Sequence, residues 1–196
     1  AFASGGVIFE EPKTTLQTDT LYFDRIKQEA YYRSGGTVTD TASTLNSRIG
    51  RYFATSKNYQ FNNQVKIKNP KYTINSQQLD FYSQTGASYL YGPSTIVSDS
   101  STVYCERGFY NTREDTGYFV KNSKLDYQSR TLYGDSIYFD RNKSFASATN
   151  NIKVIDTTNQ SIVRGHYAEV YRQKDSVFIT KRAVAVSLQE RDSVYI

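Results

Sequence analysis

A period of 58 residues runs through the chain and constrains its fold more than any single motif does. An alternating triplet with an apolar residue at each end returns at this step. Its copies are Leu21-Tyr22-Phe23, Leu79-Asp80-Phe81, Ile137-Tyr138-Phe139 and, one residue early, Val194-Tyr195-Ile196. The same register holds for Val38, Ile96 and Val154, for Ile67 and Leu125, and for Phe61, Phe119 and, one residue late, Phe178. We therefore expect one structural unit to be stacked repeatedly, each copy burying its apolar face against a neighbour.

A weaker half-step divides each period into units of about 29 residues, alternating near 32 and 26. Within the units, apolar and polar residues alternate, as in Ile152/Val154 and Val177/Ile179. Successive side chains of a strand point to opposite faces, so each such pair lies on one side. No long stretch shows the three-and-four spacing of apolar residues typical of a helix. The sequence therefore predicts an all-β fold.

Short polar segments separate the alternating runs, at 24–28, 34–36, 84–86, 141–143 and 173–175. A parallel neighbour would need a crossover of about a dozen residues, so we interpret these segments as turns between antiparallel strands. Such an array must cover its apolar face with two facing sheets, a closed barrel or a partly open clamp.

Inward positions differ systematically in size along the repeats. Large residues recur at Phe23, Phe81 and Phe139, and small residues recur at Ala30, Ser88 and Ala146. This pattern fits either a tapered, fully packed core or a lengthwise groove, and the sequence leaves both open. In either case it predicts an apolar stripe along the array.

The net charge of +5 and the pI of about 9.1 raise the question of a nucleic-acid partner. The 24 basic residues are scattered among 19 acidic ones, with no block of like charge. Where they cluster they alternate, as in Val65-Lys66-Ile67-Lys68, which is typical of a strand with one wet face. We predict no nucleic-acid binding, and an anionic partner remains the alternative.

No constellation for catalysis, metal or cofactor binding stands out. The recurring acids Asp24, Asp40, Asp140 and Asp156 follow strands and precede polar turns, where Asp bonds its own backbone. His166 is the single histidine and Cys105 the single cysteine, and neither has a partner of its own kind. We expect no enzyme, no catalytic residues, no metal site and no cofactor.

No apolar run approaches the roughly 20 residues of a membrane-spanning helix. The chain begins and ends inside a repeat and contains no methionine. We expect residues 1–196 to form a single repeat domain, excised from a longer protein whose signal peptide has been removed.

One recurring phrase resembles a known family. The phrase begins with an acidic residue, continues with an apolar and an aromatic residue at alternate positions, and ends with Asp; it occurs at 19–24 and 135–140. Small residues at alternate positions and an apolar strand follow it, as in 146–156. These phrases resemble the OstA-like domain of lipopolysaccharide-transport (Lpt) proteins, and the wealth of Tyr is similar to the Bacteroidota branch. The resemblance runs from Val7 to Ile196.

The resemblance implies an elongated, taco-like antiparallel β-jellyroll that cradles the acyl chains of lipid A and associates end to end. It implies a periplasmic location, or the periplasmic part of an outer-membrane-associated protein, with lipopolysaccharide or a related lipid and other Lpt-type envelope proteins as partners. Homo-association of the ends is implied as well. The residues expected to line the lipid-binding interior stripe are Leu21, Phe23, Val38, Ile67, Leu79, Phe81, Ile96, Phe119, Leu125, Ile137, Phe139, Val154 and Phe178.

Two other functions fit the same pattern. An envelope interaction scaffold would have a packed core and use outward aromatic residues, since Tyr22, Tyr138 and Tyr195 recur opposite the stripe. A right-handed parallel β-helix acting on polysaccharide fits less well, because parallel coils do not use short hairpin turns.

Overall fold

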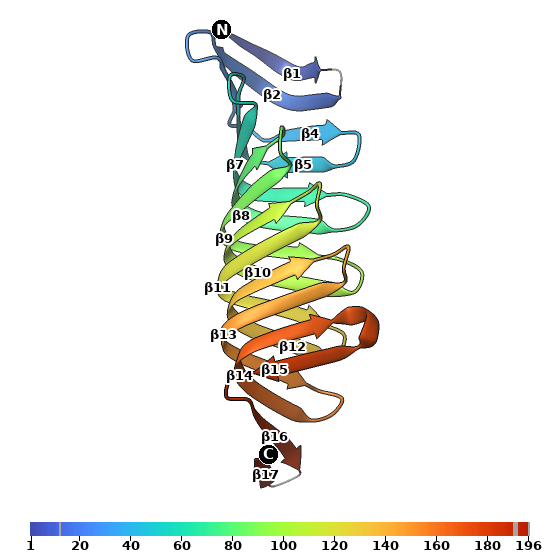
Figure 1. Ribbon diagram of the computed structural model, residues 1–196. Helices are drawn as coiled ribbons and strands as arrows, with labels where there is room; N and C mark the ends of the chain where they lie inside the picture. Colours follow the sequence, from blue (N-terminus) through green and yellow to red (C-terminus); the bar gives the residue numbers. More distant parts are fainter. Residues whose placement is uncertain (12, 190–191, 196) are drawn as a thin grey trace.

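The computed structural model describes residues 1–11, 13–189 and 192–195, and most of them lie in strands. Figure 1 shows these strands stacked along one long axis, with the two termini at opposite ends. In chain order the strands are β1 (Phe2–Glu11), β2 (Thr14–Asp24), β3 (Glu29–Tyr32), β4 (Gly36–Asp40), β5 (Thr44–Ser47), β6 (Ile49–Phe53), β7 (Asn58–Lys68), β8 (Thr73–Tyr82), β9 (Ala87–Val97), β10 (Ser101–Asn111), β11 (Thr116–Tyr127), β12 (Arg130–Asp140), β13 (Phe145–Asp156), β14 (Ser161–Tyr171), β15 (Ser176–Thr180), β16 (Val184–Gln189) and β17 (Asp192–Tyr195). A single 3-10 turn, η1 (Arg172–Lys174), joins β14 to β15.

All pairings among the described strands are antiparallel. From β8 to β13 each strand pairs with the strand before it and the strand after it. Nearer the N terminus the strands are interrupted, so that β2 pairs with both β3 and β4, and β7 with both β5 and β6. The predicted elongated antiparallel fold is confirmed, and the parallel β-helix is excluded.

Each long strand bends at its middle, which folds the array over on itself. Bulges interrupt the ladder at the bends, for example between Asn62 and Val65 of β7 and between Val120 and Ser123 of β11. A bulge bends a strand and increases its twist. We call this line of bends the spine. The segment 34–36, predicted as a turn, is such a bend between β3 and β4, because both of these strands pair with β2.

Left-handed backbone marks the repeat more regularly than the sequence did. At the spine it occurs at Gly6, Gly35, Gln64, Asn122 and Asn151, which follow a step of 29 residues (64 − 35 = 29). The copy between Gln64 and Asn122 is Gly92, one residue early. In one row of turns it occurs at Gln28, Lys57, Gly86, Asp115 and Ser144, again 29 apart (57 − 28 = 29). As far as Asn151 the structural unit is therefore an even 29 residues, and the predicted alternation of 32 and 26 was wrong.

The bend creates two layers that end in two rows of turns. Rim A consists of the turns at 24–28, 53–57, 82–86, 111–115, 140–144 and 171–175, and layer A lies between it and the spine. Rim B consists of the turns at 40–43, 69–72, 98–101, 127–130 and 156–161, together with Lys13, and layer B lies between it and the spine. We call the line where the rims face each other the seam.

Layer B carries an uninterrupted apolar ladder on its inner face. Its members lie directly opposite one another on successive strands, because alternation puts every second residue inward. They are Phe9, Leu16, Val38, Leu45, Ile67, Ile74, Ile96, Val103, Leu125, Leu132, Val154 and Val163. The predicted apolar stripe therefore runs along the array.

Layer A alternates large and small residues on its inner face. Phe81, Ser88, Tyr110, Gly117, Phe139 and Ala146 oppose one another in this order. A Cβ on Gly117 would lie 2.5 Å from the Phe119 ring, so glycine here lets the ring pack against the backbone. From β10 to β14 the interior is filled, and Phe119 and Ile137 are fully buried, as is Leu79 on β8.

Candidate binding groove

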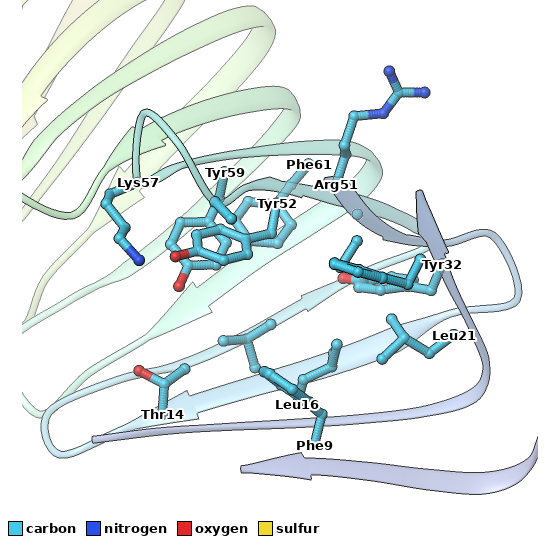
Figure 2. Close-up of a pocket in the computed structure, with 15 residues that line it drawn as sticks. Phe9, Thr14, Leu16, Leu21, Tyr32, Arg51, Tyr52, Lys57, Tyr59 and Phe61 are labelled. Atoms are coloured by element: carbon cyan, nitrogen blue, oxygen red, sulfur yellow. The ribbon is translucent and has the colours of Figure 1, made fainter. Parts of the chain in front are cut away.

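The N-terminal third of the array contains a cavity of about 330 Å³ with an almost entirely apolar lining. Figure 2 shows Leu16, Leu21 and Phe9 on one wall, facing Tyr52 and Phe61 on the other. Phe9 and Phe23 both line the cavity and yet remain 46% and 39% exposed. Apolar side chains thus face an open space rather than a packed core.

A second cavity of about 330 Å³ adjoins the first and is lined by both rims. The two share Thr14, Val38, Tyr59 and Phe61 in their walls. The second extends to Ile67, Tyr72, Phe81 and Ser88 and opens between rim B residues 40–43 and rim A residue Ser83. We call the two cavities together the N-terminal groove.

Tyr32 closes the groove on the spine side. Its ring is buried between Gly36 and Gly50, where a Cβ would lie 2.5 and 2.4 Å from ring atoms. Its hydroxyl shares a 2.6 Å hydrogen bond with Ser47 Oγ. Burial raises the pKa of Tyr32, against the opposing effect of that hydrogen bond. The base of the groove is therefore a fixed, neutral aromatic surface.

Stacked aromatic rings form the layer A wall. The Tyr52 and Tyr59 rings lie 4.6 Å apart, and Tyr59 lies 5.9 Å from Phe61 and 6.3 Å from Phe81. Such pairs contribute about 0.5–1.5 kcal/mol beyond the area they bury. The wall is thus stiff before anything occupies the groove.

The groove ends where a charged and aromatic cluster joins the two rims. Lys71 on rim B lies 2.9 Å from the carboxylate of Asp115 on rim A, and the Tyr110 hydroxyl donates to Asp115 at 3.1 Å. The Tyr72 ring packs edge-on against Tyr110, and the Arg141 guanidinium lies 5.3 Å from the centre of the Tyr72 ring. Burial first, then Tyr72 and Asp115, raise the pKa of Tyr110, so it remains a hydrogen-bond donor.

Further contacts close the seam toward the C terminus. Arg130 on rim B donates to Asp156 at 2.9 Å and also pairs with Asp175 on rim A. Arg172 on rim A bonds Ser100 on rim B, and its guanidinium lies 4.7 Å from the Tyr127 ring centre. A cavity of only about 10 Å³ remains between Leu125 and Val177. In the described structure, no ion pair, ring contact or hydrogen bond joins the 40–43 turn to the 53–57 or 82–86 turns.

All but one of the residues predicted to line the interior stripe fall into two groups. The groove brings together Leu21, Phe23, Val38, Ile67 and Phe81. Those packed into the filled interior are Leu79, Ile96, Phe119, Leu125, Ile137, Phe139 and Val154. Both alternatives left open by the sequence thus occur in one chain, a groove in one part and a packed core in the other.

Phe178 was wrongly placed in the interior. It is 56% exposed and stacks edge-on against Tyr171 on the outer face. The hairpin after Val154 is two residues longer than its equivalents: Val154 opposes Val163, whereas Ile96 opposes Val103. An insertion of two residues leaves the alternation of inward and outward side chains unchanged, so the residue equivalent to Phe119 is Ile179. The predicted register was shifted by one residue instead, to Phe178, and a shift of one residue selects the opposite face of the strand.

Several groove residues were not among the predicted ones, including Phe9, Leu16, Tyr32, Tyr52 and Tyr59. Leu16 shares the 58-residue step with Ile74 and Leu132, so its inward position could have been predicted. The tyrosines could not, because other tyrosines of the same strands, such as Tyr31, point outward. The predicted fourth triplet reaches Ile196, which lies outside the described residues.

The recurring acids act as turn residues, as predicted. Asp24, Asp40 and Asp156 each accept two backbone N–H groups from the turn that follows, and Asp140 accepts one. Among the described residues no cluster of His, Cys, Asp and Glu could hold a metal ion. Cys105 is buried, and that burial raises the pKa of its thiol to about 12. Among the described residues, no helix is long and apolar enough to cross a membrane.

The fold resembles that of a solved structure. The crystal structure of LptH from Pseudomonas aeruginosa, the LptA-homologous periplasmic component of the lipopolysaccharide transport device, superimposes with a TM-score of 0.51. The match covers 63% of this chain and 92% of that chain at 10% sequence identity, so it concerns the fold. Among curated proteins none matches this sequence. The part of the chain that matches the family described as OstA-like protein, residues 2–77, is also the part that forms most of the N-terminal groove.

Proposed function

We propose that this chain is a non-enzymatic lipid-binding module that holds acyl chains in its N-terminal groove. The observation that carries this proposal is the open apolar groove, whose floor continues the inner ladder of layer B. Its size falls in the range of roughly 300–1,000 Å³ that is usual for ligand pockets. Phe9 and Phe23, which line the groove and are partly exposed, would become buried by an apolar ligand in the groove.

The energetics favour an acyl chain as the occupant. Each methylene removed from water contributes about 0.8 kcal/mol, so ten of them contribute about 8 kcal/mol. The first cavity offers few polar partners, since its lining is almost entirely apolar and the Tyr32 hydroxyl is engaged by Ser47. A polar ligand would leave its hydrogen bonds unmade at a cost of about 1–3 kcal/mol each.

We further propose lipopolysaccharide or a related lipid as cargo, the periplasm as location and other Lpt-type envelope proteins as partners. The OstA-like match and the likeness to periplasmic LptH support this assignment, and the Tyr-rich repeats support a Bacteroidota-type member. Association of chains end to end belongs to the same proposal. Among the described strands β1 pairs only with β2, so its other edge can accept a further strand.

The test is lipid binding by a groove variant and a matched surface variant. Val38→Glu places a carboxylate in the wall shared by both cavities, whereas Val97→Glu makes the same change on the exposed outer face. Burying a charge beside an acyl chain costs at least 1.4 kcal/mol, so we expect about tenfold or weaker binding for Val38→Glu. Binding is measured by calorimetry with circular dichroism as the check of folding. Equal affinity of the folded variants would contradict the proposal.

An interaction scaffold is the second candidate, favoured by exposed aromatic residues on the outer face of layer A. Tyr89 packs on Phe109, and Tyr118, opposite Tyr138, is also exposed. This function predicts no saturable lipid binding by the wild-type chain, which the same calorimetry measures. It also predicts that Tyr89→Ala, and not Val38→Glu, removes capture of an envelope partner.

A further inference from the structure

In two rim A turns, one side chain reaches across the seam to rim B. It is the left-handed residue that ends the turn, two residues before an inward residue of the next strand, as Asp115 precedes Gly117 and Asp175 precedes Val177. Both aspartates form an ion pair with a basic residue of rim B, Asp115 with Lys71 and Asp175 with Arg130. At this register the seam is closed by opposite charges.

The equivalent register at the groove carries like charges instead. Lys57 stands one 58-residue period before Asp115 and is the left-handed residue of its own turn. Lys13 stands one period before Lys71, and each lies four residues after a member of the layer B ladder, Phe9 or Ile67. In the closed part of the seam, a lysine on rim B faces an aspartate on rim A. At the equivalent positions of the groove, both rims carry a lysine.

Both lysines lie at the groove, and neither belongs to an ion pair of the described side chains. Lys57 lines the first cavity and Lys13 the second. The Lys57 ammonium lies 5.8 Å from the centre of the Tyr52 ring. Figure 2 shows Lys57 on the same side of the cavity as Thr14, the residue after Lys13.

Two other charged groups near the lysines have hydrogen-bond or ion-pair partners of their own. The Asp40 carboxylate on rim B accepts the backbone N–H groups of Ala42 and Ser43. Arg51 points away from the cavity in Figure 2 and pairs with Glu29 at 3.5 Å. The two lysines thus place positive charge that belongs to no ion pair of the described side chains beside an apolar space, an arrangement that fits an anionic amphiphile.

We propose that Lys13 and Lys57 form a headgroup site that binds the phosphate of a lipid whose acyl chain occupies the groove. The phosphate takes the place that the Asp115 carboxylate has in the closed part, accepting charge-assisted hydrogen bonds from both rims. Lipid binding would then complete the seam over the groove. This inference rests on the proposed lipid-binding function and adds the chemical class of the headgroup.

The experiment compares three probes by calorimetry: dodecyl phosphate, dodecyl maltoside and inorganic phosphate, all below micelle concentrations. Wild type is compared with Lys13→Gln, Lys57→Gln, the double variant, Lys57→Asp and a control, Lys66→Gln, which changes an exposed outward lysine of β7. We expect the double variant to bind dodecyl phosphate about tenfold more weakly, with dodecyl maltoside and the control unchanged. Lys57→Asp should weaken dodecyl phosphate binding at least as much, because it restores a pair with Lys13.

Each result has a defined meaning. Undiminished binding of dodecyl phosphate by the double variant would overturn the headgroup site, while maltoside binding that Val38→Glu weakens would leave the lipid-binding function standing. Inorganic phosphate binding as tight as dodecyl phosphate would overturn a lipid source for the anion. Failure of wild type to bind either dodecyl probe would overturn both proposals.

Discussion

Asp156 shows how a single side chain can hold a turn and a seam contact together. Its carboxylate accepts the backbone N–H groups of Thr158 and Asn159 and the guanidinium of Arg130. Burial alone would raise the pKa of Asp156, but the Asn159 backbone, the Arg130 guanidinium and the Asn159 side chain lower it to about 2. The sequence predicted the turn contacts from residue type, and it gave no indication of the partner Arg130 in the preceding hairpin.

This lowered pKa predicts an acid-dependent loss of stability. A carboxyl group whose pKa is lowered by folding stabilises the folded state above its ordinary pKa of 3.8, and this contribution is lost as the pH falls toward about 2. We expect Asp156→Asn to be less stable than wild type at pH 6 and to approach it at pH 2. Urea unfolding at a series of pH values measures this difference.

The control for this prediction is Asp126→Asn. Asp126 pairs with Lys124 at a more exposed position, where an ion pair contributes about 0–1 kcal/mol. An equal pH dependence for wild type and Asp156→Asn would show that this carboxyl group has no role in the acid sensitivity.

At the scale of strands and turns, the spine was the element that sequence reasoning missed. Its left-handed residues include Gly6, Gly35, Asn63, Asn122 and Asn151, residue types that tolerate this backbone better than others. Their step of about 29 residues, roughly doubled between Asn63 and Asn122, was visible in the sequence as Gly and Asn. The prediction of strands rested on the alternation of apolar residues. This alternation continues on both sides of a bulge and does not mark where the strand bends.

The seam cluster at the end of the groove gives a prediction at this scale. Asp115 Oδ atoms receive the Lys71 ammonium and the Tyr110 hydroxyl, and its side chain is only 8% exposed. Asp115→Asn keeps the shape and suits the left-handed backbone, so it removes the charge and little else. We expect a loss of about 1–3 kcal/mol in the free energy of unfolding.

Urea unfolding at neutral pH measures this loss. The exposed Asp99→Asn, in a rim B turn, makes the same chemical change at a position for which we expect less than about 0.5 kcal/mol. Equal stabilities of the two variants would mean that the seam is held closed by packing alone, without its charged pairs.

For the whole molecule, the sequence predicted the class of fold and the apolar stripe, because both depend on alternation and repetition. It could not decide between a groove and a packed core. That distinction depends on rim contacts such as Lys71 with Asp115 and Arg130 with Asp175, whose members lie on different units of the stack. The units are equivalent in backbone and differ in these few side chains, so one chain contains both an open and a closed part.

The most direct test maps where an acyl chain lies along the wild-type chain. A fatty acyl probe with a diazirine near its end is bound, photolysed and located by mass spectrometry of the digested protein. The account predicts adducts on groove residues such as Leu16, Val38 and Tyr59, and none on the packed Phe119 and Ile137. Adducts spread evenly along the ladder, or confined to the outer Tyr89 and Tyr118, would contradict it.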